Sequence, residues 1–577
     1  MLNLSNRTCP RRLLFSATLL MSVFLSFSTS AQVSINDAYQ RIQDARNRAD
    51  GPLEYTYNRQ TTLDSSLRVF DSAAHFLDTL HISIPGFDNT TMKYRGCDMF
   101  RDYAGAYALD HKPDSAIYFL NRMYALGCGS INAKWISEDS SFISMRPDPR
   151  FISLVKKLNN LGKLMADSGF RSPYTANLSE DQKIAGLTLL WSQAKYNFVN
   201  FDHVDINWDQ TYLDYLPRIR ATTSTAAYYR VLQRFYAALH DGHTNVYPPD
   251  TIAKMFYSRP PIVTALIEGR VFVTEVRSDS LKQLGIVPGL EILKIDGQPV
   301  IDYAQRNVAP YASSSTTQDL QVRSYTYGLL SGPDTPVALT CKGKDGKVWT
   351  RQIARTGYHD LKKWKTMDWR VIERGKERIG YLVLNDFEHN SLRKMVDSLF
   401  PEIEKTTALV IDVRQNGGGS GNIGFYILSM LTDKPFATAS SKIIQYRSDG
   451  WSERTWFQYA DDAWQPSKQH FYSKPVALLI GPKTFSAAED FTLAFDIMKR
   501  GPLVGEATGG STGQPYLFSL PGGGSARVCA KRDTYPDGKE FVGVGIQPTV
   551  KVTPTITDLL AGNDATLEQA IATLMRP

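Results

Sequence analysis

Two segments of the chain end a short apolar run at an unusual loop, and they constrain the fold more than any other part of the sequence. The run at residues 408–413 stops shortly before three consecutive glycines that begin at Gly417, and the run at residues 475–480 stops shortly before Ser486. Short runs of branched apolar residues indicate strands buried in a sheet. A bare glycine backbone and a serine that opens a helical pattern suit acyl transfer, which needs a hydroxyl to attack a carbonyl and N–H groups to hold the oxyanion.

The region 368–577 alternates between strand and helix patterns. Strand patterns at 378–387, 408–414 and 475–481 are separated by helix patterns, and an amphipathic helix pattern closes the chain. Alternation of this kind predicts a mostly parallel sheet with helices packed against it. We therefore expect residues 368–577 to form an α/β core.

The first part of the chain is predicted to be mainly helical. Residues 32–165 contain two helical runs broken at His111-Lys112-Pro113-Asp114, a helix–turn–helix of tetratricopeptide-like appearance. Residues 176–258 form a second helical block, in which Ser179 is a good helix start. A chain of 577 residues is too long for one core, so we expect several domains, multidomain α+β overall.

Residues 260–356 change to short strand patterns. Their order is strand, short helix, a Pro288-Gly289 turn, strand, an Asp296-Gly297 hairpin turn and a closing strand pair. This order resembles a PDZ domain, a module that binds an extended peptide by adding it as a strand to a sheet edge. A β-rich insert without a ligand is the alternative.

The N-terminus has the pattern of a processing signal. Three arginines precede an apolar run, Leu13–Phe27, and Thr29-Ser30-Ala31 offers small residues for cleavage. The apolar run is short for a membrane span, although an uncleaved anchor is the alternative. We therefore expect residues 1–31 to be a signal peptide and the chain to be exported, to the periplasm or outside the cell.

Charge and cysteines exclude some classes of function. Loss of residues 1–31 removes three arginines and no acids, which lowers the net charge from +7 to +4 and argues against a nucleic-acid partner. The spacing of the cysteines matches no metal site. Cys97 and Cys128 fall in one predicted helical hairpin and could form a disulfide in an exported protein, although buried free cysteines are common. We expect no metal and no organic cofactor.

Ser486 has two interpretations. In Ser-Ala-Ala-Glu it could be a helix cap, bonded to the backbone three residues on while Glu489 bonds back. Directly behind a buried strand, it would instead lie at the positive end of a helix, where an oxyanion is favoured. The N–H of Ala487 could then donate to that oxyanion.

The glycine run also has two interpretations. A phosphate-binding loop is excluded because no Gly-Lys-Ser/Thr follows. Three glycines behind a buried strand suggest a backbone that a substrate approaches closely, rather than a plain turn. An N–H from Gly418 or Gly419 is the expected second oxyanion donor, with Asp412 and Arg414 bracing the loop.

The serine needs a base. His240 and His243 are three residues apart at the end of a helical run, and no acid or further His/Cys pattern supports a metal site there. His243 begins a loop, which suits a base. A lysine shortly after the serine would be the alternative, but the segment 504–514 contains none, and Lys531 and Lys539 are further away.

Together these motifs resemble the tail-specific, or C-terminal-processing, serine peptidases. The order is L-x-D-G-H-T, the PDZ-like region, D-x-R-x-N-G-G-G, T-F-S-A-A-E and G-x-G-I-x-P, over about residues 176–577. One branch of this family uses a Ser/Lys dyad with lysine in T-x-G-K-G, where this chain has Ser511 in the lysine's place. The chain is similar to the other, tricorn-core-like branch, which uses Ser, His and Glu.

The resemblance implies a ClpP/crotonase-like α/β core and a set of site residues. Ser486 would be the nucleophile, His243 the general base, and Gly418 with Ala487 the oxyanion hole. Some members carry a serine just before the histidine, where this chain has Gly242. Glu540 is the expected orienting acid, although it is offset by about two positions from the family's glutamate; Glu506 and Asp537 are its rivals.

The expected function is an exported serine endopeptidase that forms an acyl-enzyme. Its partner would be a polypeptide substrate, presented by the PDZ-like domain. Binding of the substrate by its C-terminus is one option, and the oligomeric state is open. A non-catalytic peptide-binding scaffold is the rival from another class. A third interpretation is a Ser/Lys peptidase in which Lys531 or Lys539 points at Ser486.

Overall fold

The computed structural model describes residues 41–46, 48, 59–79, 90–127, 131–165, 170–356, 365–446, 454–459 and 463–575. The expected signal peptide at 1–31 lies outside these residues, and so does Cys128, the expected partner of Cys97. Cys97 takes part in a disulfide. In the described part of the chain, no helix has the length and apolar character needed to cross a bilayer.

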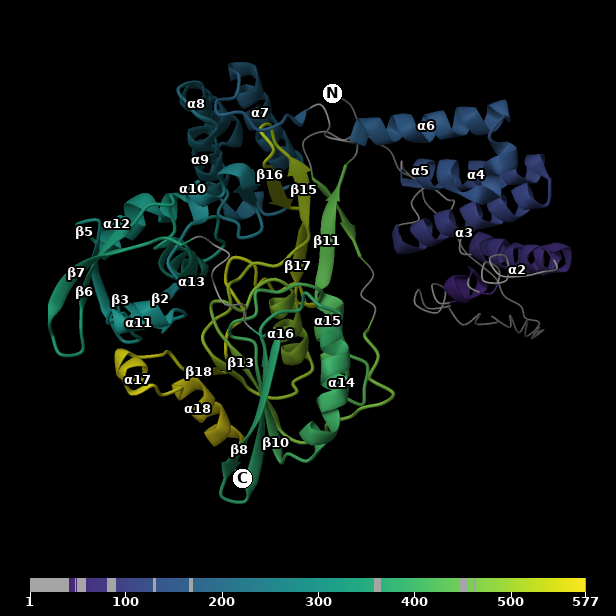
Figure 1. Cartoon of the computed structure of the whole chain (residues 1–577). Coiled ribbons are helices and arrows are strands. Elements are labelled where there is room, and N and C mark those ends of the chain that lie inside the picture. Colours follow the sequence, from purple (N-terminus) through teal and green to yellow (C-terminus); the bar gives the residue numbers. More distant parts are fainter. Residues whose placement is uncertain are drawn as a thin grey trace, which may run out of the picture.

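The N-terminal region is helical and stands to one side of the rest of the molecule (Figure 1). Its helices are α2 (Arg59–Thr79), α3 (Thr90–Leu109), α4 (Pro113–Ala125), α5 (Ile131–Glu138) and α6 (Pro149–Met165). Helix α4 begins with proline in its first turn, where the missing N–H costs no helical hydrogen bond. Phe70, Phe100 and Leu120 share a core of their own in this unit.

A second helical block leads to the loop of His243. It contains α7 (Glu180–Asn197), α8 (Trp208–Arg220) and α9 (Thr225–Ala237). The side chain of Ser179 accepts a hydrogen bond from the backbone of Gln182 and caps α7. Behind α9, strand β1 (Asn245–Tyr247) pairs antiparallel with β16 (Ser525–Cys529) near the end of the chain. This pairing ties the His243 loop to the C-terminal region.

A β-rich domain follows, at residues 262–353. Its antiparallel strands are β2 (Ile262–Ile267), β3 (Arg270–Val276), β4 (Glu291–Ile295), β5 (Gln298–Pro299), β6 (Val337–Lys342) and β7 (Val348–Ile353), in the order β2-β3-β4-β6-β7 with β5 on β4. Its helices are α11 (Asp279–Gln283), α12 (Val300–Asn307) and α13 (Thr317–Gln321). The expected hairpin turn at Asp296-Gly297 is confirmed by the pairing of Ile295 with Gln298.

The C-terminal region contains the mostly parallel sheet that the alternating pattern predicted. Its order is β18-β14-β13-β10-β9-β8, and β8 alone among these strands pairs antiparallel. The strands are β8 (Met367–Arg374), β9 (Glu377–Leu384), β10 (Ala408–Asp412), β13 (Val476–Ile480), β14 (Leu503–Gly505) and β18 (Val550–Lys551). The helices of this region are α14 (Ser391–Glu404), α15 (Gly421–Ser429), α16 (Ala487–Ile497), α17 (Ile556–Ala561) and α18 (Ala565–Leu574).

Both faces of this sheet are buried, because successive side chains of a strand point to opposite faces. Leu409 and Ile411 of β10 belong to the core that includes Phe491 of α16. Ala408 and Val410 belong to the core that includes Leu567 of α18. This two-sided burial explains why β10 and β13 appear in the sequence as continuous apolar runs.

Strands β10 and β13 are direct neighbours, with Asp412 opposite Leu479. Since they run parallel, the loops that follow them leave the same edge of the sheet. The glycine loop and the Ser486 loop therefore meet at that edge. The remaining strands, β11 (Ser440–Gln445), β12 (Thr455–Gln458), β15 (Pro515–Ser519) and β17 (Lys531–Thr534), extend beyond it in smaller antiparallel sheets with β16 and β1.

Candidate active site

Ser486 lies between the end of β13 and the start of α16 in a conformation that L-residues rarely adopt. Its backbone has φ 57° and ψ −128°. Such strained residues persist only where their surroundings hold them, and they cluster at functional sites. The Ser486 N–H donates to the carbonyl oxygen of Ser511 at 3.0 Å and, more weakly, to Glu489 Oε2 at 3.3 Å. The turn thus directs the hydroxyl out of the helix and toward His243.

His243 contacts the hydroxyl of Ser486 directly. Its Nε2 is 3.0 Å from Ser486 Oγ, and its ring stacks on Phe485 with centroids 4.8 Å apart. The side chain is buried. Burial lowers the pKa of His243 well below its usual value, and the positive charges of Arg527 and Arg323 lower it further. A buried, neutral imidazole beside a hydroxyl has the form that a general base requires.

Asp241 stabilises the loop of His243 through hydrogen bonds. Asp241 Oδ1 accepts hydrogen bonds from the His243 N–H and from Thr244 Oγ1, each at 2.9 Å, and Oδ2 accepts from Asn200 Nδ2 at 3.2 Å. His240, the other histidine of the pair, is exposed. The sequence did not single out Asp241, although it stands two residues before the histidine in the motif quoted above.

The second nitrogen of the imidazole meets a serine. His243 Nδ1 lies 2.8 Å from Ser511 Oγ. Ser511 is fully buried, and its N–H donates to Glu489 Oε2 at 2.8 Å. The sequence gives one signal for a role of Ser511 at the site: it occupies the position of the lysine in the Ser/Lys branch of the family.

Glu540, the expected orienting acid, does not contact the His243 ring in this structure. Its carboxylate contacts His203 Nε2 at 2.9 Å and Arg532, and Arg532 also binds Asp202 at 2.8 Å. The buried guanidinium of Arg532 needs anionic partners, and it draws Glu540 toward the helical block rather than toward His243. The Nδ1 position that Glu540 was expected to occupy is taken by Ser511.

The two rival acids do not replace Glu540 at His243. Asp537 Oδ1 accepts from the N–H of Lys539 at 2.9 Å in an exposed turn. Glu506 lines a cavity on another side of the core, with Gly481 and Thr553. Besides Asp241, the acid that approaches the site is Glu489, which binds the Ser511 loop. The Ser-Ala-Ala-Glu pattern indicated only a role for Glu489 in a helix cap.

Glu489 joins the Ser486 loop to the Ser511 loop. It is fully buried, and its two oxygens accept hydrogen bonds from Thr508 Oγ1, from the N–H of Gly510 at 2.7 Å and from the N–H of Ser511. Burial raises the pKa of Glu489 to about 7, and the hydrogen bonds from Thr508, Ser511 and Gly510 oppose that rise. Its contacts fix the position of Ser511 relative to α16.

Gly418 lies against the nucleophile with φ +104°, in a conformation that favours glycine. A Cβ there would be 2.7 Å from Ser486 Cβ and 3.0 Å from the nitrogen of Ala487. The Gly418 N–H, however, donates to Asn416 Oδ1 at 2.9 Å, so it is engaged within its own loop. Ala487 is the first residue of α16, where N–H groups have no acceptor in the helix.

Gly419 is the other candidate donor in this loop. Gly418 C=O accepts from the N–H of Phe387 at 2.8 Å, and the N–H of Ser420 donates to Phe387 C=O at 2.9 Å. Both bonds to Phe387 are made by the residues on either side of Gly419, so the Gly419 N–H takes no part in this pairing.

A cleft of about 750 Å³ opens in front of the site. Its lining includes His243, Ser486, the glycine loop, Arg527 and Lys531. Lys531 binds Asp533 at 3.0 Å, and although its burial acts to lower its pKa, Asp533 and Asp490 outweigh that and raise it. A lysine held as a cation is unsuited to act as the base of a Ser/Lys pair.

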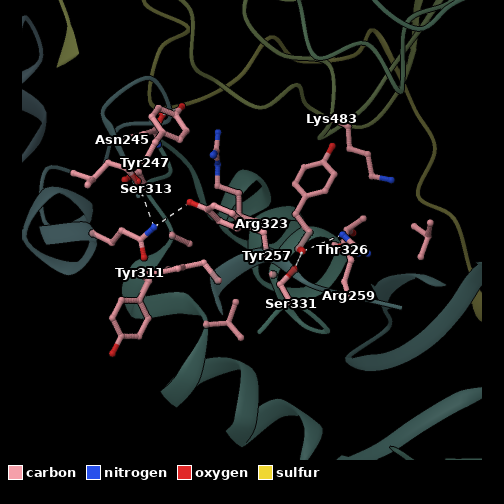
Figure 2. Close-up of a pocket in the computed structure, with 18 of the residues that line it drawn as sticks. Asn245, Tyr247, Tyr257, Arg259, Tyr311, Ser313, Arg323, Thr326, Ser331 and Lys483 are labelled. Atoms are coloured by element: carbon pink, nitrogen blue, oxygen red, sulfur yellow. Dashed lines mark hydrogen bonds between the residues drawn. The ribbon is translucent and has the colours of Figure 1, made fainter. Parts of the chain in front are cut away.

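A second cavity, of about 760 Å³, lies where the helical block, the β-rich domain and the loops of the core meet, and we call it the junction cavity. In the view of Figure 2, Asn245 and Tyr247 lie on one side of it and Lys483 on the other. Glu388 lines both the junction cavity and the cleft in front of Ser486, so the two are neighbours.

Two parts of the chain match known protein families. Residues 378–552 match peptidase family S41, and residues 187–237 match the tricorn protease C1 domain. The chain is 30% identical over 203 residues to the chloroplastic C-terminal processing peptidase of Tetradesmus obliquus, which is 33% of this chain and 40% of that protein. It is 30% identical over 179 residues to the carboxyl-terminal-processing protease of a Picosynechococcus strain, 30% of this chain and 39% of that protein. The chain thus spans about two fifths of the length of these relatives.

A solved structure shares the fold. Mature CPAF complexed with lactacystin superposes with a TM-score of 0.54 at 15% identity, covering 68% of this chain and 98% of that one. The S41 match contains the parallel strands β9, β10, β13 and β14 together with Gly418, Ser486 and Ser511, and the loop of His243 follows the C1 match directly. Residues 378–552 of the chain are therefore similar to peptidase family S41.

Proposed function

We propose that the chain is a serine peptidase in which Ser486 is the nucleophile and His243 its general base. The observation that carries the proposal is the 3.0 Å contact between His243 Nε2 and Ser486 Oγ, made by a buried imidazole whose pKa is lowered. Nucleophile and base within hydrogen-bond reach, with the base oriented by a third group, is the arrangement that serine acyl transfer uses.

The reaction would proceed in two halves. Ser486 Oγ attacks the peptide carbonyl while its proton passes to His243 Nε2, and the carbonyl oxygen becomes an oxyanion. The N–H of Ala487 and an N–H of the glycine loop, from Gly418 or Gly419, hold that oxyanion. His243 then gives the proton to the leaving amine, which departs and leaves the acyl-enzyme. Water, deprotonated by His243, releases the acyl group and restores Ser486.

The β-rich domain would present the polypeptide to this site as a PDZ-like module. The position of the junction cavity supports this, because it lies between that domain and the core and adjoins the catalytic cleft. An extended peptide along the edge of the β-rich sheet could pass through the junction cavity toward Ser486. The names of the matched relatives, which process C-termini, favour cleavage near the C-terminus of the substrate.

We also propose that residues 1–31 are a signal peptide and that the chain acts in the periplasm or outside the cell. The disulfide of Cys97 supports an oxidising compartment. Residues 32–165, tetratricopeptide-like in sequence, would then be an accessory unit attached to the peptidase.

The test is labelling with a fluorophosphonate probe, followed by peptide mapping. The label should appear on Ser486, be absent from Ser486→Ala, and fall at least 100-fold in rate in His243→Ala, since the base activates the hydroxyl (roughly 10²–10⁴-fold). Each variant is first checked for native circular dichroism and thermal unfolding. A folded wild-type chain that takes up no label would favour the rival, a peptide-binding scaffold in which Ser486 is only a helix cap.

A further inference from the structure

The environment of His243 Nδ1 differs from the one expected of a Ser/His/Glu site. The partner of Nδ1 is a hydroxyl, Ser511 Oγ at 2.8 Å, and not a carboxylate. Ser511 is held at both ends of its backbone: its N–H donates to Glu489 Oε2 at 2.8 Å, and its C=O accepts from the N–H of Ser486 at 3.0 Å. With the side chain fully buried as well, the hydroxyl has little freedom to leave the imidazole.

The absence of a side chain at residue 242 makes room for this hydroxyl. A Cβ on Gly242 would be 2.9 Å from Ser511 Oγ, 2.8 Å from Phe485 Cζ and 3.0 Å from Arg323 Nη2. Atoms in a packed interior cannot approach so closely without displacement. Positions 242 and 511 therefore share one small space beside the imidazole, and in this chain Ser511 fills it.

We propose that Ser511 is the positioning residue of this site: its Oγ accepts the hydrogen bond of the Nδ1–H of His243 and so keeps the lone pair of Nε2 facing Ser486. This rests on the proposed function. The neutral imidazole carries one proton, and the nitrogen that holds it is set by the partner of that nitrogen. Glu489 acts one step further away, through its hydrogen bonds with the backbone of residues 510 and 511.

The charges around the ring agree with an uncharged partner. Arg527 of β16, Arg323 after α13 and Lys531 of β17 surround His243 with positive charge, and burial is the largest cause of its lowered pKa. Two acids lie nearby, and each binds a backbone N–H and not the imidazole ring: Asp241 accepts from the N–H of His243, and Glu489 accepts from the N–H of Ser511. No carboxylate in the described residues donates or accepts at the ring nitrogens, so the imidazolium formed during catalysis would be stabilised less than in a carboxylate-backed site.

The first test compares Ser511→Ala with the conservative Ser511→Thr. Ser511→Ala should lower the labelling rate and kcat about 10- to 100-fold with KM within about 2-fold, because orientation of the base is used in the transition state. Ser511→Thr keeps a hydroxyl and should recover at least a fifth of the wild-type rate. The matched control is Ser429→Ala, which removes another buried hydroxyl, in α15, away from the site.

The second test reads the imidazole itself and does not depend on activity. In ¹⁵N-histidine NMR, with the signal assigned by its loss in His243→Ala, the wild type should show a protonated Nδ1 and an unprotonated Nε2 at neutral pH. Ser511→Ala should shift the Nδ1 signal or mix the two tautomers, whereas Ser429→Ala should not. An unchanged Nδ1 signal in Ser511→Ala would overturn the proposal, even if the wild type proved to have no peptidase activity.

The third test exchanges the two positions. Gly242→Ser alone should collide with Ser511 Oγ and lower both activity and thermal stability. In Gly242→Ser/Ser511→Gly, the hydroxyl enters from residue 242 and should raise turnover at least 5-fold above Ser511→Gly alone. A folded double variant with no gain over Ser511→Gly, together with Ser511→Ala activity within 2-fold of the wild type, would contradict the assignment.

Discussion

The backbone N–H of Ser486 donates to the backbone C=O of Ser511 at 3.0 Å, so the candidate nucleophile and the residue that contacts the far side of its base are directly joined. Both are also hydrogen-bonded to Glu489, whose Oε2 receives the N–H of each. A shift of either loop would therefore move the other. The geometry of Ser486, His243 and Ser511 behaves as one unit, built from the Ser486 loop, the Ser511 loop and the loop behind α9.

The strained backbone of Ser486 predicts a trade between stability and activity. Replacement by glycine relieves a φ of 57° and should raise the free energy of unfolding by about 1 kcal/mol, since relief of strain (about 1–3 kcal/mol) exceeds the entropy that glycine adds to the unfolded chain (about 0.4–1 kcal/mol). Ser486→Ala keeps the strain and should not gain this stability. Denaturant unfolding of the three proteins makes the comparison, and equal stability of the glycine and alanine variants would argue against strain.

Gly418 lies so close to Ser486 that we expect no side chain to be tolerated at position 418. Gly418→Ala places a Cβ 2.7 Å from Ser486 Cβ at a φ of +104°, and it should reduce probe labelling at least 100-fold and destabilise the chain by about 2–3 kcal/mol. Gly417→Ala is the matched control, because a Cβ at Gly417 meets nothing within 4 Å. Labelling rates and thermal unfolding of both variants decide the matter. Equal effects at the two glycines would mean that the loop, and not this contact, is what matters.

The core sheet and the pair Ser486 and His243 could be predicted from the sequence, because both depend on local sequence patterns. Continuous apolar runs at β10 and β13 mark strands buried on both faces, and parallel neighbours release their loops at one edge. The sequence motifs singled out Ser486 and His243, which the structure places in hydrogen-bond contact. These residues lie at the ends of regular elements, where position along the chain largely decides position in space.

Glu540 lies away from His243 because its position depends on long-range contacts that no local sequence pattern records. The buried guanidinium of Arg532 binds both Glu540 and Asp202, which lies far away in the sequence. Ser511 can lie beside the imidazole because Gly242, 269 positions away in the sequence, has no side chain to occupy the same space. The engagement of the Gly418 N–H with Asn416 is likewise a matter of loop geometry that the glycine run alone does not specify.

The lowered pKa of His243 predicts the pH range of activity. Burial, reinforced by Arg527 and Arg323, favours the neutral imidazole, so the base stays unprotonated below pH 6.5. The acid limb of the labelling rate should therefore have its midpoint below the ordinary histidine value of about 6.5. Rates measured from pH 4 to pH 8 with a probe that does not itself titrate provide the profile. A midpoint at or above 6.5 would show that the imidazole is paired with an anion or open to water.

The same shift affects stability. Because the pKa of His243 is lower in the folded chain than in the unfolded one, the unfolded state binds more protons as the pH falls below about 6.5. The His243 contribution to the free energy of unfolding should thus decline from pH 6.5 toward the folded pKa, and stay constant above pH 7. His243→Phe should flatten this part of the profile, as measured by denaturant unfolding at several pH values. An unchanged slope in the variant would assign the pH dependence to other groups.

Glu489 and Glu540 should differ strongly in how much the same substitution costs. Glu489→Gln replaces one acceptor oxygen by an NH₂ group among Thr508, Gly510 and Ser511, all of which donate to it, so buried donors would face each other. Loss of these bonds should destabilise the chain by about 2–4 kcal/mol and lower labelling at least 10-fold. Glu540→Gln disturbs only a partly exposed ion pair and should cost about 1 kcal/mol or less, with labelling within 2-fold of the wild type.

The paired measurement separates the two candidate acids directly. Thermal unfolding and labelling rates of Glu489→Gln, Glu540→Gln and the wild type are compared in the same buffer, with Glu489→Asp as an intermediate that keeps the charge and shortens the reach. If Glu540→Gln lost labelling while it remained folded, Glu540 would act on His243 after all, in a state where it has left Arg532. The hydrogen bonds of the folded chain favour the reverse result, because Glu489 reaches the Ser511 loop and Glu540 is committed to Arg532 and His203.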